Sequence, residues 1–156
     1  MTEKDLTPNL QVLLTFIEAH ASSEIPERGT FDPYGILLRQ NNDARQMVFL
    51  ETRDDSDEVL KGKPAPQMAR RIEDRIRQNR NDLNVESAAV VTDVSTRLVE
   101  GGEECDAVMA WLDDRGKQAV RVMIFYELNK GIFTLKEKIF EPRERLFLPP
   151  KEDLIR

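Results

Sequence analysis

Four apolar segments separated by short polar turns lie between residues 87 and 140, and they constrain the fold of this chain more than any other feature. In order, they read SAAVVTDVSTRLV, CDAVMAWLD, KQAVRVMIFYEL and IFTLKEKIF. The breaks between them contain residues that favour turns: Gly101-Gly102, Asp114-Arg115-Gly116 and Asn129-Lys130-Gly131. Parallel neighbours need a connection of about a dozen residues or more, so these short breaks predict an antiparallel meander of four strands.

The start of the chain predicts a helix followed by a β-hairpin. Thr7 can cap a free backbone N–H and Pro8 suits the first helical position, so a helix is expected over about 8–21. Its apolar residues recur at helical spacing and are Leu10, Leu13, Leu14 and Ile17. Two short apolar runs, PYGILLRQ and RQMVFLETR, follow it and are joined by Asn41-Asn42-Asp43, which tolerates turn conformations.

A second helical pattern, rich in arginine, precedes the meander. Its apolar face is narrow, which predicts a helix lying on a surface, and consists of Met68, Ile72, Ile76 and Leu83. Five arginines between residues 67 and 81 could bind phosphate or an acidic protein. Opposite charges also stand four residues apart, at Arg70–Asp74 and Glu73–Arg77. A self-neutralised, solvated helix face is the favoured interpretation.

The element order α-β-β-α-β-β-β-β predicts an α+β fold. The economical assembly is one twisted antiparallel sheet of about six strands with both helices on one face. The chain has 156 residues, 40% of them hydrophobic, which suits a single domain over residues 1–156. An extended C-terminal tail is expected at about 142–156, because Pro149-Pro150 cannot continue a helix.

Charge and cysteine content narrow the classes of partner and compartment. The formal net charge is −6, and nucleic-acid binding usually needs a basic surface, so no nucleic-acid partner is expected. A single cysteine allows no intramolecular disulfide, and the sequence shows neither a signal peptide nor an apolar run of about 20 residues. These features predict a cytoplasmic protein with no membrane partner.

The catalytic and metal-binding hypotheses that the sequence allows are weak. His20 and Cys105 formally permit a nucleophilic pair, but His20 is expected to sit at the C-terminus of the first helix, and the acidic neighbours of Cys105 disfavour a thiolate. No phosphate-binding glycine loop or nucleophile elbow is present. We therefore expect no cofactor and lean away from an enzyme.

Carboxylates cluster without the spacing of a metal site. The two loop clusters match no calcium loop and consist of Glu51, Asp54, Asp55, Asp57 and Glu58, then Glu100, Glu103, Glu104 and Asp106. Zinc lacks its usual ligands, because the chain has one histidine and one cysteine. Four carboxylates on predicted strands could include a general acid–base pair, although spacing alone brings no two together: Asp93, Asp106, Glu127 and Glu137.

The segments FDPYGILL and AAVVTDV, the latter followed by a hairpin into VRVMIFYEL, resemble those of small single-domain bacterial proteins of unknown function. This resemblance implies an α+β fold and no established activity. It supplies no functional residues.

Exposed apolar side chains lead to the functional hypothesis. Both alternating sets of residues in KQAVRVMIFYEL contain hydrophobes, and the tail carries several more, so the chain is expected to bind itself as a homodimer, or another protein. The candidate interface residues are Met123, Phe125, Leu146, Phe147 and Leu148. The alternative is a small-molecule pocket between sheet and helices, possible also in an enzyme, lined by Met109, Trp111, Phe125 and Tyr126.

Overall fold

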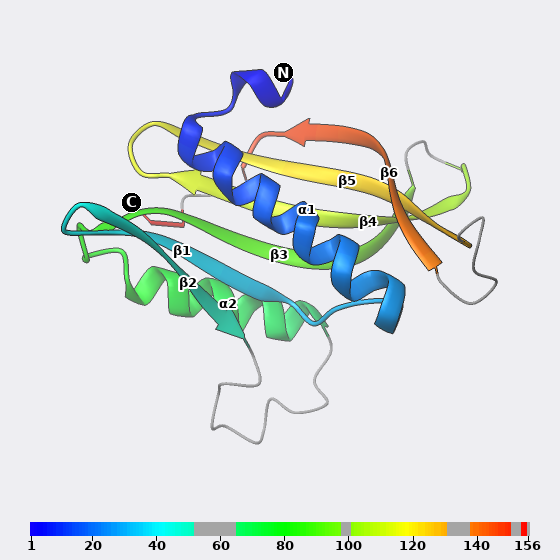
Figure 1. Ribbon diagram of the computed structural model, residues 1–156, viewed down its shortest axis with the longest axis horizontal. Helices are drawn as coiled ribbons and strands as arrows, with labels where there is room; N and C mark the ends of the chain where they lie inside the picture. Colours follow the sequence, from blue (N-terminus) through cyan, green and yellow to red (C-terminus); the bar gives the residue numbers. More distant parts are fainter. Residues whose placement is uncertain (52–64, 98–100, 131–137, 151–153, 156) are drawn as a thin grey trace.

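A six-stranded antiparallel sheet with the order β2-β1-β3-β4-β5-β6 forms the centre of the molecule (Figure 1). The computed structural model describes residues 1–51, 65–97, 101–130, 138–150 and 154–155. Its helical elements are η1 (Glu3–Asp5), α1 (Pro8–Arg28) and α2 (Ala65–Gln78). Its strands are β1 (Tyr34–Asn41), β2 (Ala44–Glu51), β3 (Val85–Arg97), β4 (Glu104–Asp114), β5 (Gln118–Lys130) and β6 (Lys138–Leu148).

The strand topology confirms the predicted α+β class and antiparallel sheet. β3, β4, β5 and β6 pair in sequence order, and β1 pairs with both β2 and β3. Asn42 takes a positive φ of 55° in the β1–β2 turn, which asparagine tolerates better than most residues. Of the expected strand over 132–140, residues 132–137 lie outside the described residues, and β6 begins at Lys138.

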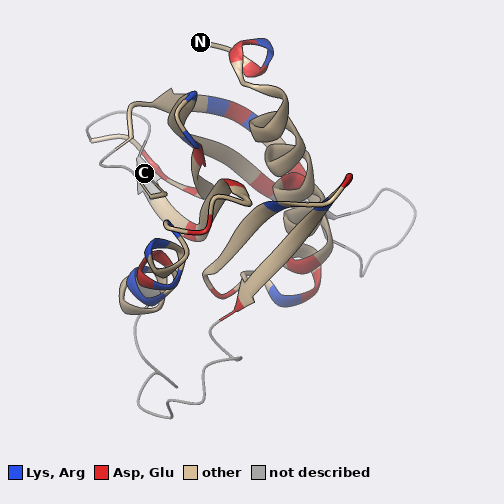
Figure 2. Ribbon diagram, turned by 90° about the vertical axis from the view of Figure 1, so that its left-hand side faces the viewer, with Lys and Arg blue, Asp and Glu red and all other residues tan. Residues whose placement is uncertain are grey.

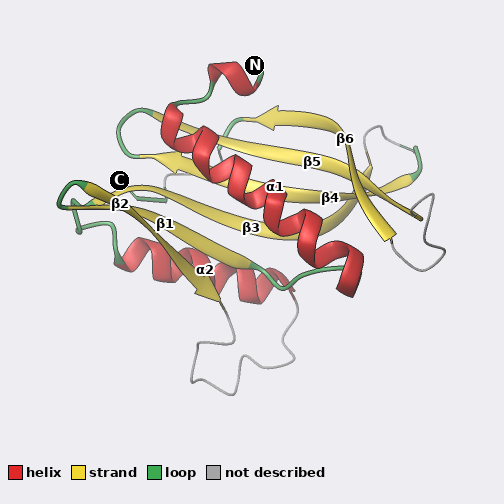
Figure 3. Cartoon of the chain, in the orientation of Figure 1, coloured by secondary structure: helices red, strands yellow, loops and turns green. Residues whose placement is uncertain are grey.

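The two helices cover opposite faces of the sheet, so the expectation that both lie on one face is wrong (Figures 2 and 3). α1 packs with Ile36 and Leu38 of β1, whereas α2 packs with Leu37 between them. Successive side chains of a strand point to opposite faces. Because the side chains of β1 are apolar on both faces of the sheet, each face is covered by its own helix.

α1 continues to Arg28, two turns beyond the predicted end, so placing His20 at the helix C-terminus is also wrong. The apolar stripe continues through Ala21 and Ile25, which are fully buried. Pro26 removes only one backbone donor from the last turn. The helix ends at Gly29, whose φ of 78° suits glycine and whose N–H donates to the Ile25 carbonyl.

α2 lies close against the backbone of β1. Ile72 and Ile76 are fully buried and face Gly35, whose missing side chain makes room for them. Leu83 lies beyond the end of the helix and is 82% exposed, so the expectation that it belongs to the apolar helix face is wrong. The predicted ion pairing within the helix is present between Glu73 and Arg77, at 3.7 Å.

The C-terminal segment packs on its own chain. Residues 142–148 form most of β6, which pairs with β5, so this part of the expected tail is a strand of the sheet. Beyond it, Leu154 and Ile155 are buried in the α2-side core beside Trp111. Both backbone N–H groups donate to Asp113 Oδ2, at 2.8 and 3.4 Å.

Candidate functional site

The structure brings four of the five predicted interface residues to one face of the sheet. Met123 pairs directly with Leu146, and Leu148 packs with Met123 and Phe125 on the α2 side. Phe147 points the other way and packs against the α1-side core. Phe147 is therefore separated by the sheet from the other four.

The four residues on the α2 side belong to an area of the sheet that neither described helix covers, and we call this area the apolar patch. Its members are Val94, Cys105, Ala107, Met109, Met123, Phe125, Leu146 and Leu148. α2 packs against β1 and β3 and reaches β4 through Arg77, whose guanidinium lies 5.9 Å from the Trp111 ring centre. Met123 and Phe125 are buried within the patch, and Leu146 at its edge is 42% exposed.

Of the four residues of the alternative pocket, the structure brings together Met109 and Phe125 but not Trp111 and Tyr126. Tyr126 lies in the α1-side core, on the opposite face from Met109 and Phe125. Trp111 is buried with α2 and the C-terminal residues. Three separate environments replace the single pocket expected from the sequence.

A different pocket, which the sequence did not reveal, lies where the C-terminal half of α1 crosses β1 and β2. It has a volume of about 100 Å³, and we call it the His20 pocket. Its lining residues are His20, Glu24, Arg28, Phe31, Asp32, Tyr34, Phe49 and Glu51. The hairpin register builds one wall of the pocket, because Tyr34 pairs with Glu51, and Ile36 pairs with Phe49 on the same face.

Aromatic rings packed against one another form the floor of the His20 pocket. The ring centres of His20 and Tyr34 are 4.5 Å apart, and those of Tyr34 and Phe49 are 4.7 Å apart and nearly parallel. Phe31 stands edge-on to His20 at 5.7 Å. Such contacts hold the rings in fixed positions.

Two polar atoms in this floor have no hydrogen-bond partner among the described residues. They are His20 Nδ1 and the hydroxyl of Tyr34, a residue that is 2% exposed. Burial raises the pKa of the Tyr34 hydroxyl, so it stays neutral. Buried polar groups nearly always have a partner in the protein or in ordered water, so this hydroxyl retains an unused hydrogen-bonding capacity.

Charged side chains form the rim of the pocket. Arg28 Nη1 lies 3.6 Å from Glu24 and Arg28 Nη2 lies 3.8 Å from Asp32. Burial lowers the pKa of His20, Glu24 and Glu51 raise it, and Arg28 lowers it. With His20 neutral, carboxylates outnumber cations among the lining residues.

Replacing His20 with phenylalanine should flatten the pH dependence of stability between about pH 7.5 and 5.5. Because burial lowers the pKa of His20 in the folded protein, the unfolded chain takes up this proton first as the pH falls. The unmodified protein is therefore most stable above the usual histidine pKa and loses stability as the pH falls through it. His20 is the only histidine, and phenylalanine keeps the ring packing. Urea unfolding of both proteins at several pH values measures the difference, and parallel pH profiles would contradict the burial of His20.

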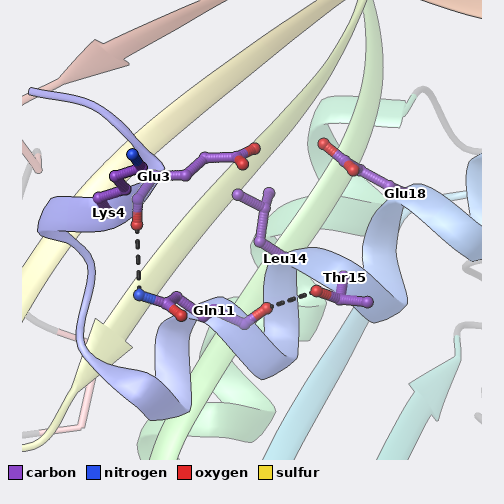
Figure 4. Close-up of a pocket in the computed structure, with 6 residues that line it drawn as sticks. All are labelled: Glu3, Lys4, Gln11, Leu14, Thr15 and Glu18. Atoms are coloured by element: carbon purple, nitrogen blue, oxygen red, sulfur yellow. Dashed lines mark hydrogen bonds between the residues drawn. The ribbon is translucent and has the colours of Figure 1, made fainter.

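A second hollow lies between η1 and α1 (Figure 4). Gln11 Nε2 donates to the carbonyls of Leu6 and Glu3, at 2.9 and 3.4 Å, which fastens the N-terminal turn to α1. The carboxylates of Glu3 and Glu18 point toward each other in Figure 4, and Arg145 of β6 forms ion pairs with both. Arg145 thus links η1, α1 and β6 beside this hollow.

Two of the carboxylates on predicted strands, Asp93 and Asp106, lie near each other on the α1 side of the sheet. Asp93 accepts hydrogen bonds from the Tyr126 hydroxyl at 2.8 Å and the Thr30 hydroxyl at 2.7 Å. Burial raises the pKa of Asp93, the two hydrogen bonds lower it, and nearby Asp106 raises it. Asp93 Oδ2 thus connects the segment just after α1 to the sheet, and Asp93 Oδ1 links β3 to β5. Glu127 points to the other face and pairs with Arg143 at 2.9 Å.

Among the described residues, the structure does not support the Cys–His pair or the metal-site hypotheses from the sequence. His20 lies on the α1 side and Cys105 in the apolar patch, so the sheet separates the two. No group of three potential ligands in the described part of the chain could hold a metal ion. Six carboxylates of the sequence hypotheses lie outside the described residues: Asp54, Asp55, Asp57, Glu58, Glu100 and Glu137.

Neither helix in the described ranges is long and apolar enough to cross a bilayer. Comparison with protein-family models, curated proteins and solved structures gives no match to this chain. The apolar patch and the His20 pocket are two candidate functional sites in the described part of the chain.

Proposed function

We propose that this chain is a protein-binding domain that associates with a second copy of itself through the apolar patch. The supporting observation is an apolar half-face of the sheet that neither described helix covers. Leu146 is 42% exposed there, and Met109 and Leu148 are partly exposed. A large apolar side chain left in water forfeits about 1.5–3 kcal/mol relative to full burial. Association would recover part of this free energy.

The charges around the apolar patch favour a second copy as the partner. Arg121 and Glu127 occupy the same face of β5 as Met123 and Phe125 and lie on either side of them. A twofold axis between two facing sheets, perpendicular to β5, reverses the strand direction. It sets Arg121 of each copy, whose Nε donates to the Pro149 carbonyl, opposite Glu127 of the other, which also pairs with Arg143. The two ends of the patch carry opposite charges, so the same surface is complementary to itself.

Light scattering at tens of micromolar tests the proposal. We expect a mass of twice 18.0 kDa for the unmodified chain and a return to 18.0 kDa for Leu146→Glu, because a carboxylate would be buried unpaired in the interface. Leu83→Glu is the matched control, since Leu83 is 82% exposed and lies outside the apolar patch. This variant should keep the dimer mass.

The same experiment can overturn the proposal in two ways. An unmodified chain that scatters as a monomer excludes self-association at these concentrations. A dimer that Leu146→Glu and Leu83→Glu leave equally intact places the interface elsewhere. Circular dichroism of both variants shows whether a lost dimer reflects lost fold.

A further inference from the structure

We propose that the His20 pocket binds the head of an organic cation, an alkylammonium or guanidinium group. The pocket lies on the α1 side of the sheet, away from the apolar patch, so this proposal does not depend on self-association. Three features of the pocket point to this chemistry: its aromatic floor, its excess of carboxylates and its orphan hydroxyl.

The aromatic floor favours a cation over an anion. The faces of aromatic rings carry partial negative charge and attract an ammonium or guanidinium group within about 6 Å of the ring centre. Phe31, Tyr34 and Phe49 all line the pocket, and their contacts with His20 hold them in place. His20 is itself neutral when deprotonated, so it adds a fourth ring without adding positive charge.

The rim supplies the compensating charge. Glu24 and Asp32 line the pocket together with a single cation, Arg28, so the carboxylates exceed the cations even without counting Glu51, which also lines the pocket and has an interaction of its own. Arg28 is held by Glu24 and Asp32 at 3.6 and 3.8 Å and is 52% exposed, so it lies at the outer edge. A ligand cation would share these carboxylates with Arg28.

Tyr34 identifies where the ligand would be fixed. Tyr34 lines the pocket, and its hydroxyl oxygen is buried and has no partner among the described residues. An ammonium or guanidinium N–H is a donor that this oxygen can accept. Occupation by a cation would satisfy the one buried hydroxyl that the fold leaves without a hydrogen bond in this pocket.

The volume limits the size of the group. A cavity of roughly 150 Å³ holds a benzene ring. At about 100 Å³, the His20 pocket accepts a smaller group, such as methylammonium or methylguanidinium. The same head group occurs in a free amine and at the tip of a lysine or arginine side chain, and the test separates these two sources.

Titration of the full chain with methylguanidinium, followed by NMR, tests the proposal. We expect shifts confined to the pocket residues and a Kd of about 1–10 mM for so small a ligand. Methylurea has the same shape without the charge and should cause no comparable shifts. A second titration with acetyl-Gly-Arg-Gly-amide distinguishes the sources, since tighter binding of the peptide indicates a side chain of another polypeptide, and binding of methylguanidinium alone indicates a free small molecule.

Three charge variants on α1 make the test specific. Glu24→Gln should weaken methylguanidinium binding about fivefold, and Arg28→Gln should strengthen it about threefold by removing a competing cation. Glu27→Gln is the matched control, because Glu27 is an exposed residue of the same helix that does not line the pocket. It should change the Kd by less than about twofold.

Several outcomes would overturn the proposal. These are equal shifts with methylguanidinium and methylurea, no shifts at about 20 mM ligand, or equal effects of Glu24→Gln and Glu27→Gln. Tyr34→Phe adds a separate check, since loss of the hydroxyl should weaken binding while the ring remains. If Tyr34→Phe fails to fold, the three α1 variants still decide the question.

Discussion

Replacing Gly35 with alanine is expected to destabilise the protein by about 1–3 kcal/mol, although alanine is ordinarily no worse than glycine inside a strand. An added Cβ would lie 2.6 Å from Ile72 Cγ2 and 3.3 Å from both Ile76 Cδ1 and the Ala89 carbonyl oxygen. Ile72 and Ile76 are fully buried, so neither can move aside without displacing α2. Urea unfolding, with the midpoint and slope compared between the two proteins, measures the loss.

A double-mutant cycle with Ile72→Ala shows whether the contact with α2 causes the loss. Ile72→Ala alone should cost about 2–5 kcal/mol because it leaves a cavity. In the double variant, the new methyl group of residue 35 occupies part of that cavity. The double variant should therefore lose less stability than the sum of the losses of the two single variants. Strict additivity would show that α2 does not pack against Gly35.

The Asp113→Ala variant should lose about 2–4 kcal/mol of stability and release the end of the chain. Asp113 is 1% exposed, and its Oδ2 accepts both the Leu154 and Ile155 N–H groups. Without this acceptor, two buried donors lose their partner, and both side chains can leave the core beside Trp111. Trp111 is the only tryptophan, so its emission should move to longer wavelength when its cover is lost.

Two variants control for the loss of charge. Asp113→Asn keeps an oxygen acceptor in nearly the same place and should lose less stability than Asp113→Ala. Asp74→Ala removes a carboxylate that is 53% exposed on α2 and should be close to neutral. If Asp113→Ala keeps both its stability and its Trp111 emission, the end of the chain is not held by this carboxylate.

The strands could be predicted from the sequence because local signals define them. Alternating apolar residues and turn residues such as Asn42 and Gly116 act over a few positions, and they gave the antiparallel order. The helix faces could not be predicted in the same way. Ile36, Leu37 and Leu38 are all apolar, so the pattern of β1 does not say which set faces which helix.

The errors at the chain ends have related physical causes. The sequence predicts a helix that ends at about residue 21, but the apolar stripe continues to the buried Ile25, and Pro26 removes only one backbone hydrogen bond near the helix end. Pro149-Pro150 predicts an extended tail from about residue 142, whereas residues 142–148 belong to the edge strand β6, where proline is tolerated. In both cases, tertiary packing extends a regular element into a segment that contains proline.

The His20 pocket could not be predicted because it depends on the hairpin register and on the full length of α1. One signal was available: pairing from the Asn42 turn places Tyr34 and Glu51 opposite each other, with Phe49 on the same face. Glu24 and Arg28 join His20 in lining this pocket because the helix continues past residue 21, which the sequence did not predict.

The position of α1 across β4 and β6 affects how the chain can fold during synthesis. The first residue of β6 is made about 110 residues after the end of α1, or on the order of 5–20 s later at ribosomal rates. During that time, Leu13, Leu14 and Ile17 have no completed sheet to pack against. α1 is therefore the first α-helix to be synthesised and among the last elements to dock. The nascent chain presents the apolar residues of α1, which a chaperone can hold until translation reaches β6.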